Sequence, residues 1–465
     1  MPRFFIVDQS IVRVGGHHFH QAALIANAAR RRGFEPVVAA NRRVARRDWP
    51  VPCELVAQFP STCYDGCSAC FAIGPQQPLN PFRVQPDAAA RRPDGLLSEP
   101  FGQSNSLINR IRRLISARRL RKRSYRLASG FARSLELFFD RFPLTPDDWV
   151  FLPTITEFDL VGLVEYLAKH PEGQRARWGL VFHYPLVIGP WTGDAAQLAR
   201  LEVMRSHFQE LADRVPTVNW RFYGSTRLIV DQYQKLGLTH QVELAPPPVQ
   251  VEPLGPEPAL EHPQFPEQPL RVLCAGGLRS FKTSSLLREV TEELERDDFA
   301  GGKLQLWVQS NSRRRLARRS GGRNWTTVSA RELKPGADVR LVHVPHPLPA
   351  TAYAKLLRTA DIGLLGYLPT NYASTHSGVL AEFLANGVPV VVTDQTWMAS
   401  ELATAAGGAE QASGRVARTP AEFADGLRAI ASDIELYRAR ATRIAPSYTA
   451  QNSADALLDI VTRPW

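Results

Sequence analysis

Two segments in the second half of the chain carry residues that could bind phosphate groups. The first, CAGGLRSFK at 274–282, combines a glycine turn that includes Gly277 with the cations Arg279 and Lys282, three residues apart. Glycines let the backbone approach a ligand closely, and paired cations bind phosphate oxygens. Because the segment ends a short apolar run, it predicts a diphosphate site in the loop after a strand.

The second segment, DIGLLGYLPTNYASTHSGVLAEFLANGVPVVVTD, begins at residue 361. Ser377 and Gly378 open a predicted helix, and the free N–H groups at a helix start can receive a phosphate. Glu382 lies one turn further along, where a carboxylate can accept hydrogen bonds from both hydroxyl groups of a ribose. The alternative is a solvated helix residue, but the apolar neighbours of Glu382 favour a binding role. Together the two segments predict a nucleotide-diphosphate site.

A cysteine cluster has the spacing of a known metal-binding motif. Cys63, Cys67 and Cys70 form C-x3-C-x2-C, the spacing with which radical S-adenosylmethionine enzymes hold a four-iron cluster. Adding Cys53 would permit a four-thiolate zinc site, although ten residues before Cys63 is an unusual separation. The surrounding strand and helix pattern is not that of a half-barrel. We therefore favour cysteines in a surface loop that bind nothing.

Three histidines crowd the start of the first predicted helix. His17 and His20 share a helix face and could chelate a metal. No acidic residue close in sequence supports such a site. We expect His17, His18 and His20 to contribute polar side chains to a cleft, and we expect no metal.

Strands and helices alternate along most of the chain. Residues 2–8 (PRFFIVD) predict a short apolar strand, Gly15 and Gly16 form a tight turn, and 18–33 are amphipathic before a second strand at 35–40. The alternation resumes after residue 147 and again after a proline-rich stretch. The pattern predicts an α/β protein of two Rossmann-like, doubly wound domains facing a cleft.

The second phosphate segment resembles the donor-site signature of GT-B glycosyltransferases, in particular the retaining glycosyltransferase family 4. The match consists of Glu382, Ala385, Gly387, Pro389, Val390 and Val391. Two positions depart from the family pattern: the first glutamate of its pair would fall at Ser374, and the glycine after the phosphate lysine is Thr283. The donor sugar therefore does not follow from the resemblance.

The resemblance also implies roles for other residues. Arg279 and Lys282 look like the cations that neutralise the donor diphosphate, and Gly15-Gly16 looks like the glycine turn of the first domain. His183, in VFHYP, looks like the histidine of the family's cleft. The implied reaction moves a sugar from a UDP- or GDP-linked donor to a glycan or lipid-linked acceptor, with retention, without a metal or other cofactor, as in bacterial polysaccharide biosynthesis.

The domain boundaries follow from these patterns and the resemblance. We expect an acceptor-binding domain at 1–248 with a basic insertion at about 75–146, then a proline-rich linker at 249–269. A nucleotide-sugar domain would occupy 270–447. The last helix, at 448–465, could pack back on the first domain.

Charge and hydropathy restrict the location and the partners. The chain has 465 residues, a net charge of +11 and a pI near 9.7, without an apolar run long enough to span a membrane. Its apolar start predicts a strand, not a signal peptide, so we expect a soluble cytoplasmic protein. Residues 106–128 place nine Lys and Arg beside apolar residues at helical spacing, which favours peripheral contact with an anionic membrane face over nucleic acid. A solvated charged face is the alternative.

Two other functions fit the same fold. A nucleotide-sugar epimerase would need acid and base carboxylates and no acceptor. A non-catalytic nucleotide-sugar or glycan-binding protein is suggested by Ser374, where the family carries a carboxylate.

Overall fold

The computed structural model divides the chain into two compact units. Unit 1 comprises Met1–Pro247 and Leu457–Trp465, and unit 2 comprises Pro248–Ala456. The residues described are 1–13, 17–65, 125–187, 189, 191–238, 240–249, 269–278, 282–283, 286–295, 298, 302–329 and 339–464. The predictions for Gly15, Gly16, Arg279, Cys67 and Cys70, for most of the basic insertion and for nearly all of the linker fall outside these residues.

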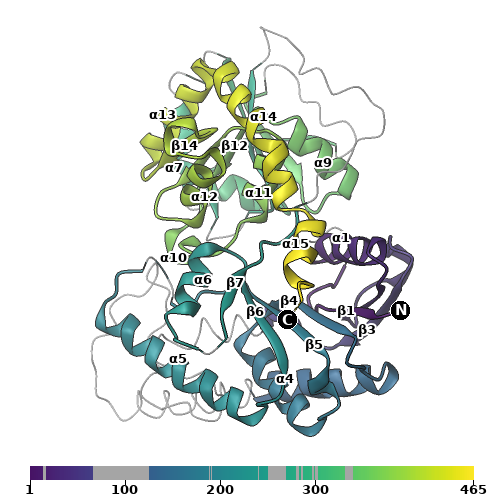
Figure 1. Cartoon of the computed structure of the whole chain (residues 1–465). Coiled ribbons are helices and arrows are strands. Elements are labelled where there is room, and N and C mark those ends of the chain that lie inside the picture. Colours follow the sequence, from purple (N-terminus) through teal and green to yellow (C-terminus); the bar gives the residue numbers. More distant parts are fainter. Residues whose placement is uncertain are drawn as a thin grey trace, which may run out of the picture. The chain divides into compact units, whose positions relative to one another are not determined.

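Unit 1 is built on one parallel sheet of seven strands (Figure 1). The strands are β1 (Arg3–Val7), β2 (Glu35–Asn41), β3 (Glu54–Phe59), β4 (Trp149–Ile155), β5 (Arg177–Phe182), β6 (Asn219–Gly224) and β7 (Val242–Leu244). They lie in the order β3-β2-β1-β4-β5-β6-β7, and every neighbouring pair is parallel. The reversal of order beside β1 is the doubly wound arrangement predicted from the sequence. β3 was not predicted.

The helices of unit 1 follow local sequence signals. They are α1 (His17–Arg31), a helix over 125–141, α4 (Glu157–Lys169), α5 (Ala195–Arg214) and α6 (Arg227–Gln234). The chain leaves α1 through Gly33, whose φ of +80° is the left-handed conformation that favours glycine. α4 begins with a capping box, in which Thr156 and Asp159 each bind the other's backbone N–H.

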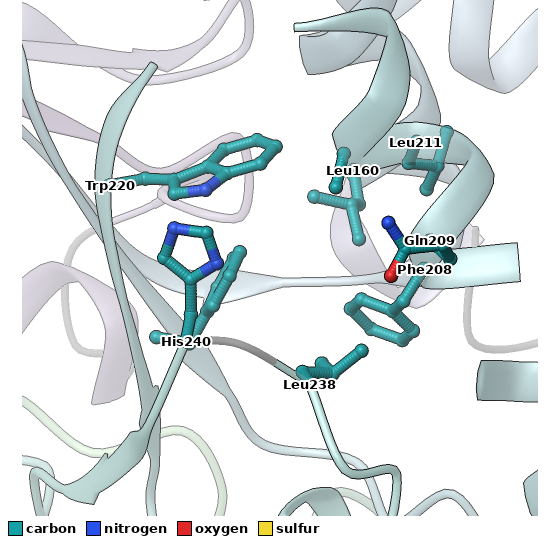
Figure 2. A pocket seen from close by; sticks show the side chains of 9 residues that line it. Leu160, Phe208, Gln209, Leu211, Trp220, Leu238 and His240 are labelled. Atoms are coloured by element: carbon teal, nitrogen blue, oxygen red, sulfur yellow. The ribbon is translucent and has the colours of Figure 1, made fainter. Parts of the chain in front are cut away.

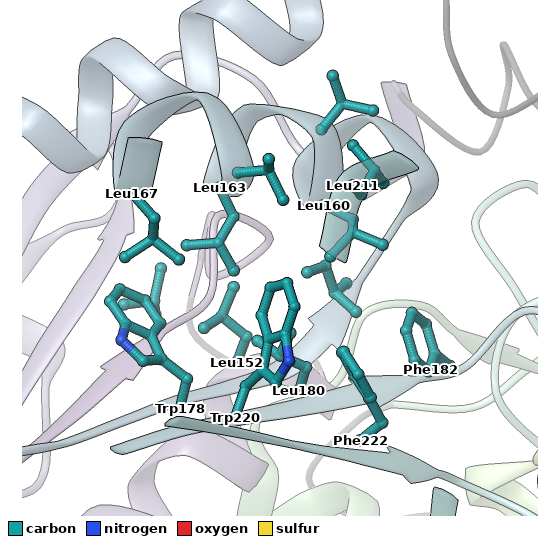
Figure 3. Close-up of a cluster of buried hydrophobic side chains, with 14 of the residues drawn as sticks. Leu152, Leu160, Leu163, Leu167, Trp178, Leu180, Phe182, Leu211, Trp220 and Phe222 are labelled. Carbon is teal, nitrogen blue, oxygen red and sulfur yellow. The ribbon is translucent and has the colours of Figure 1, made fainter. Parts of the chain in front are cut away.

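Helix spacing in α4 builds part of the core of unit 1. Leu160, Leu163 and Leu167 recur at intervals of three and four residues, so they share one helix face. They point toward Trp178 on β5 and Trp220 on β6, as Figure 3 shows. This apolar contact fixes the helix against the sheet whose strand ends carry polar residues.

The last part of the segment predicted as a basic insertion is a core helix of unit 1. Residues 125–141 are helical, and their apolar side chains, including Phe131, Leu135 and Phe138, belong to the core of unit 1. The helix also approaches α4 closely, because a Cβ on Gly162 would lie 2.3 Å from the carbonyl oxygen of Ala128. This part of the chain is therefore integral to the first unit.

The end of the chain contacts unit 1. In α15 (Ala454–Val461) and the residues after it, Asp459 pairs with Arg32 at 2.8 Å, and the Pro464 carbonyl accepts a hydrogen bond from Arg221 at 2.6 Å. α15 lies beside α1 in Figure 1. Chain from Leu457 onward therefore belongs with the N-terminal unit in space.

Unit 2 repeats the parallel architecture. Its strands are β8 (Leu270–Cys274), β9 (Leu304–Ser310), β10 (Thr326–Thr327), β11 (Leu341–Pro345), β12 (Ile362–Leu365), β13 (Val390–Thr393) and β14 (Gly414–Ala417). They lie in the order β10-β11-β9-β8-β12-β13-β14, with every pair parallel. The two sheets confirm the predicted α/β class.

The helices of unit 2 connect these strands and close the unit. They are α7 (Leu287–Leu294), α8 (Arg313–Arg319), α9 (Ala350–Arg358), α10 (Pro369–Tyr372), α11 (Gly378–Ala385), α12 (Trp397–Ala406), α13 (Pro420–Ser432) and α14 (Ile434–Gln451). The long helix α14, which contains Pro446, was not predicted. Within the described residues, no helix is long and apolar enough to cross a membrane.

Candidate functional site

The candidate site lies where the strands of unit 2 end. Because parallel strands point the same way, the residues after β8, β9, β11 and β12 share one edge of the sheet. Gly276 follows β8, Gln309 is at the end of β9, His346 follows β11 and Tyr367 follows β12. Of the predicted phosphate-binding residues, Gly277, Lys282, Ser377 and Gly378 are at this edge.

The glycine turn after β8 admits no side chain. Gly276 and Gly277 have φ of +83° and +70°. A Cβ on Gly276 would lie 2.6 Å from Val379 Cγ2, and one on Gly277 would lie 2.9 Å from His346 Nε2. The turn is therefore wedged between the start of α11 and the loop after β11.

The side chain of Gln309 fixes this turn. Its Oε1 accepts the backbone N–H of Gly276 at 2.8 Å, and the residue is 1% exposed. A buried side-chain acceptor satisfies a backbone donor that would otherwise be lost to burial. Gln309 thus holds the glycine turn against its neighbouring strand.

Lys282 projects back toward the glycine turn. Its Nζ lies 4.9 Å from the centre of the Tyr367 ring, and a Cβ on Gly276 would be 3.4 Å from the same atom. An ammonium group over an aromatic face is stabilised by the ring's negative potential. The structure therefore brings one of the two predicted phosphate cations to the turn, while Arg279 is outside the described residues.

The start of α11 forms the opposite side of the site. Ser377 is the N-cap, and its hydroxyl oxygen accepts the N–H of Leu380 at 3.3 Å. The next N–H groups, those of Gly378 and Val379, belong to the first turn, where backbone donors have no partner within the helix. Since Val379 packs on Gly276, these donors lie beside the glycine turn.

Glu382 lies one turn further along α11 and is partly buried. Its Oε2 accepts a hydrogen bond of 2.6 Å from the hydroxyl of Tyr353 on α9. Burial raises the pKa of Glu382 to about 7, although the Tyr353 hydroxyl and the charge of Lys282 both act to lower it. The predicted carboxylate is thus present at the edge, with one oxygen already bound.

Ser374, which takes the place of the family's first glutamate, lies before α11 and is 5% exposed. A serine there supplies a hydroxyl in place of a carboxylate. Thr283, the other departure from the family pattern, is uncharged. Its hydroxyl oxygen accepts a hydrogen bond from the N–H of Gly366 at 3.2 Å. This bond links the segment of Lys282 to the end of β12.

In unit 1, His183 lies directly after β5. Its Nε2–H donates to the carbonyl oxygen of Pro153 at 2.8 Å, which fixes the tautomer. Burial and the neighbouring positive charge of His18 lower the pKa of His183 to about 4. The ring is therefore neutral at physiological pH, where it can form hydrogen bonds but carries no positive charge.

A second polar cluster follows β1, and the sequence did not reveal its pairing. His18 Nδ1 lies 2.8 Å from Asp8 Oδ2, and its Nε2 lies 3.1 Å from the Tyr64 hydroxyl, which is also 3.2 Å from His17 Nε2. Burial lowers the pKa of His18, but the Asp8 carboxylate, together with Tyr64 and Cys63, outweighs burial, and the pKa is raised well above 6.5. Asp8, ten residues before His18 in the sequence, is thus its acidic partner.

Cys63 is buried beside this cluster. Its N–H donates to the Ser10 hydroxyl at 2.9 Å, and that hydroxyl donates to Cys63 Sγ at 2.8 Å. Among the described residues, no group of three or more His, Cys, Asp or Glu side chains is placed to hold a metal ion. Cys67 and Cys70 lie outside the described residues.

A small hollow in unit 1 is apolar and belongs to the core. Figure 2 shows Trp220, Phe208 and Leu211 around it, with His240 at its side. A ligand site normally combines an apolar wall with several converging polar groups. Only Gln209 and His240 among the lining residues are polar, so the hollow is a gap in packing between the sheet and its helices.

Sequence reasoning missed three side chains at the edge of unit 2. Gln309, Tyr353 and Tyr367 contact the predicted residues from β9, α9 and the end of β12. A polar residue at the end of an apolar strand was the available signal for Gln309. Tyr353 carries no such signal, because an aromatic residue in an amphipathic helix is usually a core residue.

Known structures resemble this chain over its whole length. It is similar to trehalose-6-phosphate synthase OtsA, with 13% identity, full coverage of both chains and a TM-score of 0.61. It is also similar to the trehalose-6-phosphate protein of E. coli bound with UDP-2-fluoro glucose, with 14% identity over 98% of this chain and 97% of that chain, and a TM-score of 0.58.

A third similar structure is WaaG, a glycosyltransferase involved in lipopolysaccharide biosynthesis, with 14% identity over 99% of this chain and 100% of that chain, and a TM-score of 0.52. No family model matches the chain, and no curated protein matches it in sequence. At these identities the likeness concerns the fold, and it covers both parallel seven-stranded sheets. The chain therefore has the GT-B fold of these glycosyltransferases.

Proposed function

We propose that this protein is a glycosyltransferase that takes a sugar from a UDP- or GDP-linked donor bound at the edge of unit 2. The observation that supports it is the convergence there of four features. They are the glycine turn at Gly276-Gly277, the ammonium of Lys282, the start of α11 after Ser377 and the carboxylate of Glu382. Backbone donors and cations suit a diphosphate, and a carboxylate suits ribose hydroxyls.

The chemistry follows from where charge develops. When the bond between the sugar C1 and the diphosphate oxygen breaks, negative charge grows on the leaving nucleoside diphosphate. Lys282, Arg279 and the N–H groups of Gly378 and Val379 would stabilise that charge. The acceptor hydroxyl approaches C1 from the face that the diphosphate leaves, so the new bond would keep the anomeric configuration, and the hydroxyl proton passes to the departing phosphate. The cation and N–H groups would stabilise the leaving group without a metal.

The finer parts of the proposal concern the acceptor. We place it, a glycan or a lipid-linked sugar, on unit 1, with the neutral ring of His183 as a hydrogen-bonding group for a sugar hydroxyl. The basic residues 110–126 would bring the enzyme to an anionic membrane face on the cytoplasmic side. Binding to acidic-lipid vesicles that weakens steeply with salt, and no binding to neutral vesicles, would support this contact.

A panel of UDP- and GDP-sugars tests the main proposal. Transfer, or slow release of the free nucleotide by hydrolysis, supports a glycosyltransferase. Interconversion of donor sugars would instead identify an epimerase, and binding without turnover would identify a non-catalytic protein, as Ser374 suggests. Lys282→Ala should lower kcat/KM by about tenfold or more, because the cation is needed most in the transition state.

A further inference from the structure

We propose that Tyr353 is a positioning residue for nucleotide binding: its hydroxyl holds one oxygen of Glu382 so that the other oxygen is directed to the ribose hydroxyls of the donor. The proposal rests on the function given above. It adds a residue from α9, outside both phosphate-binding segments, to the recognition of the nucleotide.

The contact itself is short and joins two separate elements. Tyr353 is in the first turn of α9, Glu382 is in α11, and their side chains meet at 2.6 Å. Hydrogen bonds between a hydroxyl and an ionised carboxylate are short and about twice as strong as neutral ones. In the described part of the chain, this is the side-chain hydrogen bond that restrains Glu382.

The backbone beneath Tyr353 is well fixed. Its N–H donates to the carbonyl of Pro349 at 2.9 Å, which begins the α9 ladder. On the other side, the N–H of Asn386 donates to the carbonyl of Glu382 at 3.0 Å, inside α11. Two helices with fixed backbones therefore define where the carboxylate can lie, and the tyrosine hydroxyl selects one of its rotamers.

The charged and titratable groups around Glu382 make the tyrosine important. They are Tyr353 from α9, Lys282 from the loop after β8 and Tyr367 from the end of β12. Burial favours the protonated acid, whereas the Tyr353 hydrogen bond and the Lys282 charge favour the carboxylate. Ribose hydroxyls are best bound by the carboxylate, because the ionised group accepts hydrogen bonds at both oxygens.

Removal of the hydroxyl therefore has two consequences. Tyr353→Phe keeps the ring but frees the carboxylate to rotate, and it shifts the protonation of Glu382 toward the acid. We expect the affinity for UDP or GDP to fall about three- to tenfold at pH 7, the range for the net contribution of one ordinary hydrogen bond. The fall in affinity on acidification should also begin at a higher pH than in the wild type.

The test is calorimetric titration of the full chain with UDP, GDP and their 2′-deoxy analogues, from pH 6 to 8.5. The wild type should bind the ribonucleotide better than the deoxy analogue, and Tyr353→Phe should reduce that preference. A matched control is Tyr448→Phe, since Tyr448 on α14 is also buried beside a carboxylate, Glu401 on α12. This control should alter the melting temperature while leaving nucleotide affinity unchanged.

Glu382→Gln separates failure of this inference from failure of the proposed function. If Glu382→Gln weakens nucleotide binding but Tyr353→Phe matches the wild type in affinity and pH profile, the positioning role is wrong and the site stands. Unchanged affinity in Glu382→Gln would overturn the ribose site itself, and the positioning role with it. An equal loss for ribose and 2′-deoxyribose nucleotides in Tyr353→Phe would also reject the positioning role.

Discussion

Gln309 Oε1 accepts the backbone N–H of Gly276 at 2.8 Å, and this bond ties the end of β9 to the turn after β8. The turn must be held in place because the left-handed conformation of Gly276 alone does not determine its direction. Val379 packs against one side of the turn, and Gln309 holds it by the hydrogen bond.

Gly276→Ala should disrupt the turn. The added Cβ would lie 2.6 Å from Val379 Cγ2, at a φ of +83° that alanine rarely adopts. We expect a loss of about 1–3 kcal/mol in stability and at least about tenfold weaker UDP or GDP binding. Thermal melting and calorimetry measure the two effects.

Gly378→Ala is the control for stability. A Cβ at this position would meet no described atom within 4 Å, and alanine favours the helix that begins here. Its melting temperature should equal or exceed that of the wild type. Equal melting temperatures for Gly276→Ala and the wild type would contradict the crowding at the turn.

Tyr367 should act on Lys282 through its ring, not its hydroxyl. Lys282 Nζ lies 4.9 Å from the ring centre. Tyr367→Phe should therefore keep nucleotide affinity within about twofold, whereas Tyr367→Leu should lower it by about threefold to tenfold, the strength of a partly desolvated cation–π contact. Comparable affinities for Tyr367→Leu and Tyr367→Phe would show that the ring does not position the lysine.

Glu382 should make the stability of unit 2 depend on pH. Its pKa is about 7 in the folded chain, against an ordinary value of 4.5, so folding takes up a proton between these values. The unfolded state then binds fewer protons than the folded state, and stability falls as the pH rises from 4.5 to 7. Glu382→Gln should raise the melting temperature relative to the wild type by about 5–10 °C more at pH 8 than at pH 5. A constant difference would argue against the raised pKa.

The contact between Asp8 and His18 should make unit 1 less stable at alkaline pH. Because the pKa of His18 is raised well above 6.5, its stabilisation is complete below pH 6.5 and is lost as the pH rises through the folded value. Asp8→Asn should cost about 2 kcal/mol near neutral pH, the value of a buried charge-assisted hydrogen bond. The difference in melting temperature between Asp8→Asn and the wild type should become smaller at alkaline pH. A difference that does not change with pH would exclude the ion pair.

Gly162→Ala tests the helix over 125–141. Its Cβ would lie 2.3 Å from the carbonyl oxygen of Ala128, so α4 and this helix would have to separate. We expect a loss of about 1–3 kcal/mol, measured by denaturant or thermal unfolding. Gly130 is on the helix over 125–141, and a Cβ there would meet no described atom within 4 Å. Gly130→Ala should therefore stabilise the folded protein by up to about 1 kcal/mol. The same change in both variants would contradict the packing of this helix on α4.

The sequence by itself determined the elements and the residues that could bind phosphate. Apolar runs and helical periodicity depend on the chain locally, so β1, α1 and the strand leading to Gly277 were predictable, as was the helix start at Ser377. The core helix over 125–141 was not predicted from periodicity. The apolar residues that it buries follow directly after a run of basic residues, which favoured a charged surface segment.

Only the tertiary structure decided which side chains meet. Gln309 and Gly276 are 33 residues apart, and Tyr353 and Glu382 are 29 apart, so no local pattern records either contact. The strand order β9-β8-β12 determines which of these residues meet, because it brings the carboxyl ends of strands that are distant in sequence to one edge of the sheet. The pKa of Glu382 and the neutral state of His183 depend in the same way on burial and on neighbouring charges. Both are properties of the packed environment, which a residue's type and spacing do not contain.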